Sequence, residues 1–413
     1  MKTNTQKLFR RDFTLVVIGQ IISLFGNAIL RFALPLYLLR ETGSSSLFGA
    51  VTACSMIPMI VLSLIGGILA DRVNKRNIMV ILDFSTAILI TVFYLSLGKV
   101  PTVPLFIVVL MLLYGISGTY QPAVQASIPA LVSDENLMAG NAVINQVSTL
   151  SGLLGPVIGG AIFGAAGIFP ILLVSIVCFA VSAVMEIFIH IPHQRQPRTQ
   201  GIFRVAREDL AESYRFVRTE KPIFFTVVFL VAAFNLVLSA VMMIGIPVLV
   251  VQVLGMSDMR MGLAEAALAL GGLVGGLLAA VLSQRLHLKD SPLLLAACSL
   301  AVGIVGLALM AGLPAEACYW VITGLSFAAM GAATLFSVQM FTLVQRESPA
   351  HLVGKILAAM ISISMCAQPV GQALYGVLFD RFAGSEWVVM IGAAVVSLLI
   401  GLYSKRVFSK IED

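Results

Sequence analysis

Charged residues are scarce in this sequence. Only 11% of its 413 residues are Asp, Glu, Lys or Arg, whereas about 25% of a typical soluble domain is charged. Apolar residues make up 59% of the chain and its mean hydropathy is +1.01. So few charges cannot cover a surface exposed to water. The composition therefore excludes a soluble globular protein and predicts that lipid surrounds most of the chain.

The sequence also lacks the patterns of common enzyme sites. It has no phosphate-binding G-x-x-x-x-G-K-[ST], no H-E-x-x-H and no G-x-S-x-G motif. The cysteines lie singly in apolar segments, so we expect small core residues rather than disulfides or metal ligands. We expect no enzyme activity, no cofactor and no metal. The five cysteines are Cys54, Cys178, Cys298, Cys318 and Cys366.

Long runs without charge dominate the chain instead. A helix needs roughly 20 apolar residues to cross the hydrocarbon of a bilayer, and dividing the runs at their turns predicts an all-α integral membrane protein with twelve spans. One long run must fold back, and we place its turn at Gly164–Pro170. No alternation of apolar and polar residues suggests a β-barrel. The predicted spans are Phe13–Leu39, Leu47–Ala70, Asn77–Leu97, Pro104–Pro129, Leu137–Ala165, Ile168–Ile191, Ile223–Val253, Met259–Ser283, Pro292–Gly312, Glu316–Gln345, Gly354–Phe379 and Glu386–Ser404.

The basic residues predict the orientation of these spans. With the N-terminus inside, the inner segments hold 21 of the 26 Lys and Arg residues and the outer loops hold 4, which satisfies the positive-inside rule. Arg31 lies within the first span. We therefore expect both termini to be cytoplasmic in the plasma membrane. The net charge of +6 follows from topology and gives little support to nucleic-acid binding.

The chain divides into residues 1–191, a linker over 192–221 and residues 222–413. The linker carries a basic amphipathic helical pattern suited to the inner membrane surface, where it could be a simple tether or a regulatory element. The two halves also match at a common offset of 212, as when Pro35 is compared with Pro247, Leu131–Glu135 with Leu343–Glu347, and Gly159–Gly164 with Gly371–Gly376. Parallel repeats of this kind are typical of transporters that rock two halves around a central site.

A dense group of charges follows the second predicted span, four residues after Gly67. Its three cations hold a short loop on the inner side. Its carboxylate does not help orientation, so we expect it to pair with a neighbouring cation or to approach a helix N-terminus of the other half, where the helix dipole favours an anion. Asp83, two turns into the third span, could pair with one of the arginines. The four charged residues are Asp71, Arg72, Lys75 and Arg76.

The fifth predicted span carries a run of glycines around a proline. Glycines allow close approach of helices, and a proline inside a helix removes a hydrogen bond and bends it. We expect a thin, bent helix at a moving interface, with ordinary small-residue packing as the alternative. The positions are Gly152, Gly155, Pro156, Gly159 and Gly160.

Both motifs resemble those of the major facilitator superfamily. The loop resembles its signature G-x-x-x-D-R-x-x-R-R/K, with Lys75 where many members have Arg, and the glycine run resembles the fifth-span motif of its exporters. The resemblance covers the whole chain and is greatest to the group of macrolide and enterobactin exporters, on the evidence of Gly19–Leu30, Arg40–Ser45 and Pro122–Val132. It implies two pseudo-symmetric six-helix bundles, with the charged loop latching them on the cytoplasmic side.

One position departs from the family pattern. Drug:proton antiporters of the superfamily commonly carry an Arg in the fourth span, three residues before a Gly. Here that Gly is Gly118 and the position is occupied by Gly115. The usual proton-relay Arg is absent, which puts the standard coupling scheme in doubt.

Two charges inside predicted spans are candidates for coupling. Arg31 and Glu265 lie in opposite halves, about 12 Å and about 9 Å from the outer ends of their spans. Because charges in a membrane are costly and often functional, we expect the two to approach when the outside is closed and to part when it opens, with Glu265 as the proton-sensitive member. Two separate snorkelling side chains are the alternative. Asp83 and Glu186 lie nearer the inner ends, where structural pairing or snorkelling is expected.

The resemblance assigns the first, fourth, seventh and tenth spans to a central cavity. A large, mostly apolar cavity with few polar groups suits amphipathic ligands, and Arg31 as its one formal charge favours anionic or zwitterionic substrates. The cavity candidates are Asn27, Arg31, Tyr114, Tyr120, Gln121, Gln125, Asn235, Ser239, Phe336 and Gln339.

We therefore expect a gradient-driven exporter of small amphipathic molecules, multidrug or macrolide-like, that works as a monomer with protons as the coupling ion. One alternative is a dedicated exporter of an anionic metabolite such as a siderophore, and another is a lysolipid flippase. A non-transporting receptor or scaffold is an alternative of a different class, but it does not explain the two repeated halves.

Overall fold

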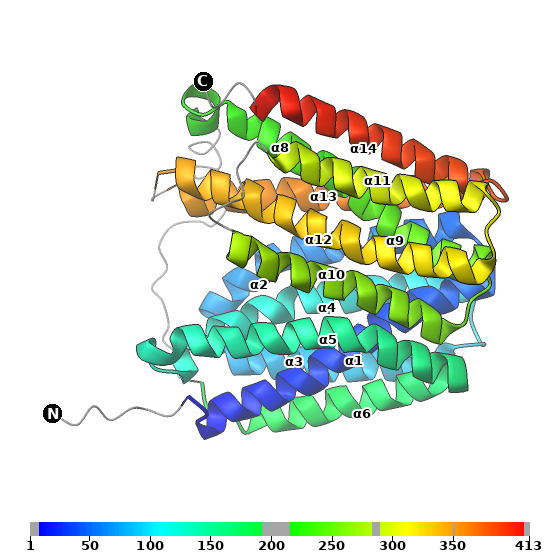
Figure 1. Cartoon of the computed structure of the whole chain (residues 1–413). Coiled ribbons are helices and arrows are strands. Elements are labelled where there is room, and N and C mark those ends of the chain that lie inside the picture. The colour runs from blue at the N-terminus through cyan, green and yellow to red at the C-terminus, as the bar shows by residue number, and fades with distance from the viewer. Residues whose placement is uncertain (1–7, 192–214, 283–289, 350–351, 409–413) are drawn as a thin grey trace. The chain divides into compact units, whose positions relative to one another are not determined.

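The computed structural model describes residues 8–191, 215–282, 290–349 and 352–408. Within these ranges the chain is helical and has no strand, and twelve helices are long and apolar enough to cross a membrane (Figure 1). The predicted all-α class and the number of spans are confirmed. Most of the sequence-predicted linker, including most of its amphipathic pattern, lies outside the described residues.

The helices follow the predicted spans closely and run a few residues further at several ends. The described elements are α1 (Arg11–Thr42), α2 (Ser45–Arg72), α3 (Lys75–Ser96), α4 (Thr102–Leu131), η1 (Asp134–Asn136), α5 (Leu137–Ala166), α6 (Ile168–Ile187), α8 (Ile223–Phe234), η2 (Asn235–Ser239), α9 (Ala240–Pro247), η3 (Val248–Val253), α10 (Asp258–Leu282), α11 (Ser291–Met310), α12 (Ala315–Glu347), α13 (Val353–Arg381) and α14 (Glu386–Phe408).

Local chemistry explains where several helices begin and end. Gly167 separates α5 from α6 within the predicted turn and has a φ of +74°, a conformation that glycine adopts without steric cost. The side chain of Asn74 accepts a hydrogen bond at 3.0 Å from the backbone N–H of Arg76 at the start of α3. This cap satisfies one of the unpaired N–H groups of the first turn.

Helix α3 shows how the sequence divides each span into two faces. Ile81, Ile88 and Leu95 recur every seven residues and are more than half exposed. Asp83 and Phe93 on other faces of the helix are buried. An apolar face that remains exposed on a folded helix bundle is the surface that lipid covers, so α3 meets both the bilayer and its own bundle.

The seventh span is interrupted by two π-helical segments. In η2, the backbone carbonyl of Leu236 packs directly against Gly371 of α13. A side chain at position 371 would collide with this carbonyl and with Ala240. The wider π-helical turn and the glycine together bring the two backbones into contact, as π segments often do near functional sites.

The described residues form two compact units. Unit 1 comprises 8–42, 54–191 and 257–266, so it includes α1, α3 to α6, most of α2 and the first turns of α10. Unit 2 comprises 43–53, 215–256, 267–282, 290–349 and 352–408, so it includes the start of α2 together with the later helices. Within unit 1, α3 packs along α4 and α6; within unit 2, α11 packs along α12 and α14 (Figure 1).

Candidate functional site

The charged loop predicted to be a latch joins α2 to α3. Asp71 and Arg72 are the last residues of α2, and their side chains lie outside the described part of the structure. Lys75 and Arg76 begin α3 behind the Asn74 cap. No atom of the described residues lies within 4 Å of a Cβ added at Gly67, so this glycine faces open space among them.

Asp83 lies in a separate environment from that loop. Its side chain is buried with a relative exposure of 2%, and Ser23 of α1 donates a hydrogen bond at 3.1 Å to its Oδ1. Among the described residues, no ion pair joins Asp83 to Arg76. The structure thus places Asp83 against α1 and α6 rather than with the cations of the loop.

A buried hydrogen-bonded chain connects α1, α4 and α6 in unit 1. The amide Nε2 of Gln20 donates to the hydroxyl of Tyr120 at 2.7 Å, and that hydroxyl donates to Oε1 of Glu186 at 2.6 Å. All three side chains are buried. Tyr120 was a predicted cavity residue, but its hydroxyl points into this chain of hydrogen bonds.

Sequence reasoning did not assign Gln20, Ser23 or Ser182 to any site. A usable signal was present, because polar residues spaced three or four apart lie on one face of a helix. Gln20 and Ser23 have this spacing in α1, as do Ser182 and Glu186 in α6. Ser182 donates to the backbone carbonyl of Gly19 at 3.2 Å, which ties the two helices together at the same level.

The glycines of α5 bring it close to α1. A Cβ added at Gly155 would collide with the side chain of Ala28, and one added at Gly159 would lie 3.0 Å from the ring of Phe32. Gly152 is different, because no atom lies within 4 Å of a Cβ added there. The motif therefore contains close-contact positions as well as one position that faces open space.

The same helix contacts the first turns of α10. A Cβ at Gly160 would collide with the backbone carbonyl of Asp258, and one at Gly262 would collide with the backbone carbonyl of Pro156. The contact is reciprocal, because each helix contributes a glycine that faces the other's backbone. Proline at 156 leaves α5 unbroken in the described residues.

Two carboxylates hold the ends of neighbouring helices. In unit 1, Oδ1 of Asp258 accepts a hydrogen bond at 2.5 Å from Nε of Arg40, near the end of α1. In unit 2, Asp380 of α13 accepts from the backbone N–H groups of Ser45 and Ser46 at 2.7 and 2.9 Å and from the hydroxyl of Ser44. Asp380 therefore caps the N-terminus of α2, where unpaired N–H groups and the helix dipole favour an anion.

The predicted coupling residues are both in unit 1. The guanidinium of Arg31 lies 4.1 Å from the ring centroid of Tyr114, in cation–π geometry. Glu265 belongs to the third turn of α10 and is partly buried. Among the described residues there is no ion pair between Arg31 and Glu265, so the structure pairs Arg31 with an aromatic ring instead.

The predicted cavity residues divide between the units. In unit 1, Asn27, Arg31 and Gln121 are partly exposed and Gln125 is exposed, whereas Tyr114 is buried beneath Arg31.

In unit 2, Asn235 begins η2 and donates to the carbonyl of Val231, and Ser239, at its end, is partly exposed. Phe336 is fully buried against Phe234, and Gln339 accepts from Ser291.

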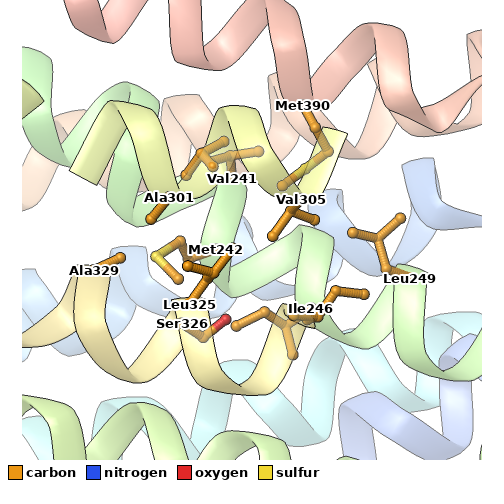
Figure 2. Close-up of a pocket in the computed structure, with 12 residues that line it drawn as sticks. Val241, Met242, Ile246, Leu249, Ala301, Val305, Leu325, Ser326, Ala329 and Met390 are labelled. Carbon is orange, nitrogen blue, oxygen red and sulfur yellow. The ribbon is translucent and has the colours of Figure 1, made fainter. Parts of the chain in front are cut away.

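Unit 2 also contains a small apolar cavity among α9, η3, α11, α12 and α14. Figure 2 shows Met242, Ile246 and Val305 pointing into it, with Ser326 as a polar group at its edge. Its volume is about 20 Å³, and a single water needs about 10–15 Å³. The cavity is too small for an amphipathic substrate and is a packing defect of the bundle.

Comparison with known proteins agrees with this geometry. The family model of the Major Facilitator Superfamily matches residues 16–367. Macrolide efflux protein A of Streptococcus pyogenes is 22% identical over 97% of this chain and 96% of its own. Multidrug efflux pump Tap of Mycolicibacterium fortuitum is 25% identical over the same shares, and enterobactin exporter EntS of Citrobacter koseri is 24% identical over 94% and 91%.

Solved structures have the same fold. The nucleoside transporter NupG superimposes with a TM-score of 0.74 over 97% of this chain and 99% of that one, at 14% identity. Together with the twelve apolar helices and the glycine contacts of α5, these findings identify a multi-pass membrane protein that transports small substrates and is not an enzyme. The chain belongs to the Major Facilitator Superfamily.

Proposed function

We propose that this protein exports small amphipathic molecules, multidrug or macrolide-like, from the cytoplasm by alternating access. The proposal is supported by its similarity to a macrolide efflux protein, a multidrug efflux pump and an enterobactin exporter. In this proposal the protein works as a monomer in the cytoplasmic membrane. Both termini lie inside, an orientation that the distribution of Lys and Arg favours. The moving bodies are residues 1–191 and 222–413, joined by the linker over 192–221.

The observation that carries this proposal is the reciprocal contact of Gly160 and Gly262. It joins α5 of the first half to α10 of the second half through backbone rather than through long side chains. In the proposed orientation these helix ends are on the outer side. Backbone contacts of this kind form tightly without ordering long side chains, so the same surface can close and release during each cycle.

A corresponding contact involves α2 and α13. Gly376 packs against the carbonyl of Ser45, and Asp380 caps the start of α2. In the proposed orientation this contact is also on the outer side, and it again joins one helix of each half. In the proposed cycle both contacts open when the outer ends separate to release substrate.

The resemblance to the superfamily assigns the substrate cavity to α1, α4, the seventh span and α12. The polar candidates on these helices are Arg31, Tyr114 and Gln121 in unit 1 and Asn235 and Ser239 in unit 2. A cavity with one cation favours anionic or zwitterionic amphiphiles. An exporter dedicated to an anionic metabolite, such as a siderophore, is therefore the second candidate, and the similarity to the enterobactin exporter supports it. A lysolipid flippase is the third.

Antiport with protons is the proposed mode of energy coupling, with Glu265 as the group that exchanges protons. Arg31 is its proposed partner while the outside is closed, although in this structure the guanidinium of Arg31 lies over Tyr114 and, among the described residues, no ion pair joins it to Glu265. A charge-swap experiment tests whether the two residues form a direct pair. Arg31→Glu and Glu265→Arg should each abolish substrate-driven transport in proteoliposomes, and the double exchange should restore it. Failure of that rescue would count against a direct pair.

The export function itself is tested in inside-out membrane vesicles. An imposed proton gradient should drive accumulation of a radiolabelled macrolide, and an uncoupler should abolish it. Accumulation of a catecholate anion without any accumulation of macrolide would favour the siderophore alternative. Movement of lysolipid alone would favour the flippase.

A further inference from the structure

The least expected feature of unit 1 is a group of polar side chains buried between α1, α3, α4 and α6. Asp83 and Glu186 are its two carboxyl groups, with relative exposures of 2% and 0%. They are close enough to repel each other electrostatically. The other members are Gln20, Ser23, Tyr120 and Ser182, and we call these six residues the carboxyl cluster.

The directions of the hydrogen bonds in the cluster are fixed by chemistry. A tyrosine hydroxyl has one proton to donate, and that of Tyr120 donates to Glu186. It therefore accepts from the Nε2 group of Gln20. The amide oxygen of Gln20 must then point elsewhere, and it is buried without a hydrogen-bond partner.

Two further oxygens in the cluster are buried without a hydrogen-bond partner among the described residues. They are Oδ2 of Asp83 and Oε2 of Glu186. Ser23 and Tyr120 donate to the other oxygen of each carboxyl group, and Ser182, which also lies close to Asp83, donates to the backbone carbonyl of Gly19. Buried polar groups are nearly always hydrogen-bonded. Three unpaired acceptors in one buried cluster therefore indicate that a donor is missing.

Charge balance points the same way. Within the described residues, no Lys, Arg or His forms an ion pair with Asp83 or Glu186. The titratable groups that face the cluster are Asp83 from α3, Tyr120 from α4 and Glu186 from α6, while α1 contributes Gln20 and Ser23, which do not titrate. Two uncompensated negative charges cannot be maintained in an apolar core.

We propose that the carboxyl cluster is a second proton-binding site, in which Asp83 and Glu186 together take up and release an exchangeable proton. A bound proton removes one charge and converts one of the unpaired oxygens into a donor for another. A metal ion fits less well, because Ca²⁺ requires about six to eight oxygen ligands and only three acceptor atoms here are unpaired.

The position of the site gives it a role in coupling, a step that rests on the proposed proton antiport. Gln20 lies on α1, seven residues before Asn27, and Tyr120 lies on α4, next to Gln121. A change in protonation at Asp83 and Glu186 would alter the hydrogen bonds that hold α1 and α4 together. The cluster thus connects, through Tyr120, two of the helices that are proposed to line the cavity, α1 and α4.

The test is pH-difference infrared spectroscopy on the purified full-length protein in detergent, which detects the carbonyl band of a protonated carboxyl group. The wild type should show a band that disappears as the pH rises. That band should be lost in the double variant Asp83→Asn/Glu186→Gln. It should be shifted in Tyr120→Phe, which removes the hydrogen bonds to Gln20 and Glu186 but keeps the ring. Glu41→Gln, an exposed carboxyl-to-amide change on α1, should leave it unaltered.

Three results would overturn the proposed proton-binding site. An unchanged band in the double variant, or a band that shows no pH dependence in the wild type, would overturn the proposal. Stabilisation of the wild type but not of the double variant by CaCl₂ or MgCl₂ would show a metal site and overturn it too. The test does not depend on substrate, so a pH-dependent band in a protein that shows no substrate-driven proton flux would uphold this site while rejecting the proposed antiport.

Discussion

Gly262 of α10 lies directly against the backbone carbonyl of Pro156 in α5, with no room for a side chain between them. The proline lacks an N–H group and sits between Gly155 and Gly159, so this part of α5 has little side-chain bulk of its own. The contact therefore requires that no side chain be present at position 262. Substitutions that add a methyl group test it directly.

Gly262→Ala and Gly160→Ala should each lower the free energy of unfolding by about 1–3 kcal/mol and reduce transport, because the added methyl group must displace backbone. Gly152→Ala is the matched control within the same motif, since its Cβ would meet open space. It should be neutral or slightly stabilising, as alanine favours helix. Thermal unfolding in detergent measures all three, and equal effects at 152 and 160 would contradict the close contact.

Tyr120→Phe should destabilise the protein by about 1–3 kcal/mol, because Nε2 of Gln20 and Oε1 of Glu186 both lose their partner in a buried site. Tyr94→Phe serves as the control, since the ring of Tyr94 packs edge-on against Phe169 and is partly exposed. Thermal unfolding again supplies the measurement. Equal stability of the two variants would show that the buried chain of hydrogen bonds contributes nothing.

Asp380→Asn should weaken the start of α2 by about 0.5–2 kcal/mol, because an amide oxygen replaces a carboxylate that accepts from two backbone N–H groups. Hydrogen exchange at the backbone amides of Ser45 and Ser46 should accelerate. Glu220→Gln, an exposed carboxyl-to-amide change, should leave that exchange unaltered. No acceleration in Asp380→Asn would mean that water caps the helix equally well.

Arg31→Gln should reduce export of an anionic substrate more than export of a lipophilic cation, because it removes the one charge proposed for the cavity. Arg31→Lys keeps the charge and much of the cation–π contact with Tyr114, so it should retain most of the anion export. Competition for macrolide transport in proteoliposomes gives the comparison. Equal losses for anion and cation would remove Arg31 from substrate selection.

The sequence was sufficient for features that depend on neighbouring residues. The long apolar runs, divided at their turns, predicted the twelve helices, and Gly164–Pro170 predicted the turn that the structure places at Gly167. Glycine and proline act locally on the backbone, and apolar length is read directly from the chain. The two motifs also indicated the family, which the match over residues 16–367 confirms.

The contacts of the candidate site could not be predicted from neighbouring residues, because they join helices that are far apart in the sequence. Gln20 and Tyr120 are a hundred residues apart, and their contact depends on how α1 and α4 are rotated against each other. Asp83 was expected near the basic loop because of its helical spacing from Arg76. The structure shows that α3 turns it towards Ser23. Gly262 carries no recognisable motif, so its contact with Pro156 could come only from the fold.

Proton flux through reconstituted protein tests the central claim most directly. Proteoliposomes with a trapped pH dye would receive a macrolide, a lipophilic cation and a catecholate anion in turn, with wild type compared with Glu265→Gln. We predict substrate-triggered proton movement in the wild type that Glu265→Gln abolishes. Substrate movement without any proton flux would contradict antiport, remove Glu265 from the mechanism and indicate a facilitator, another coupling ion or lipid flipping.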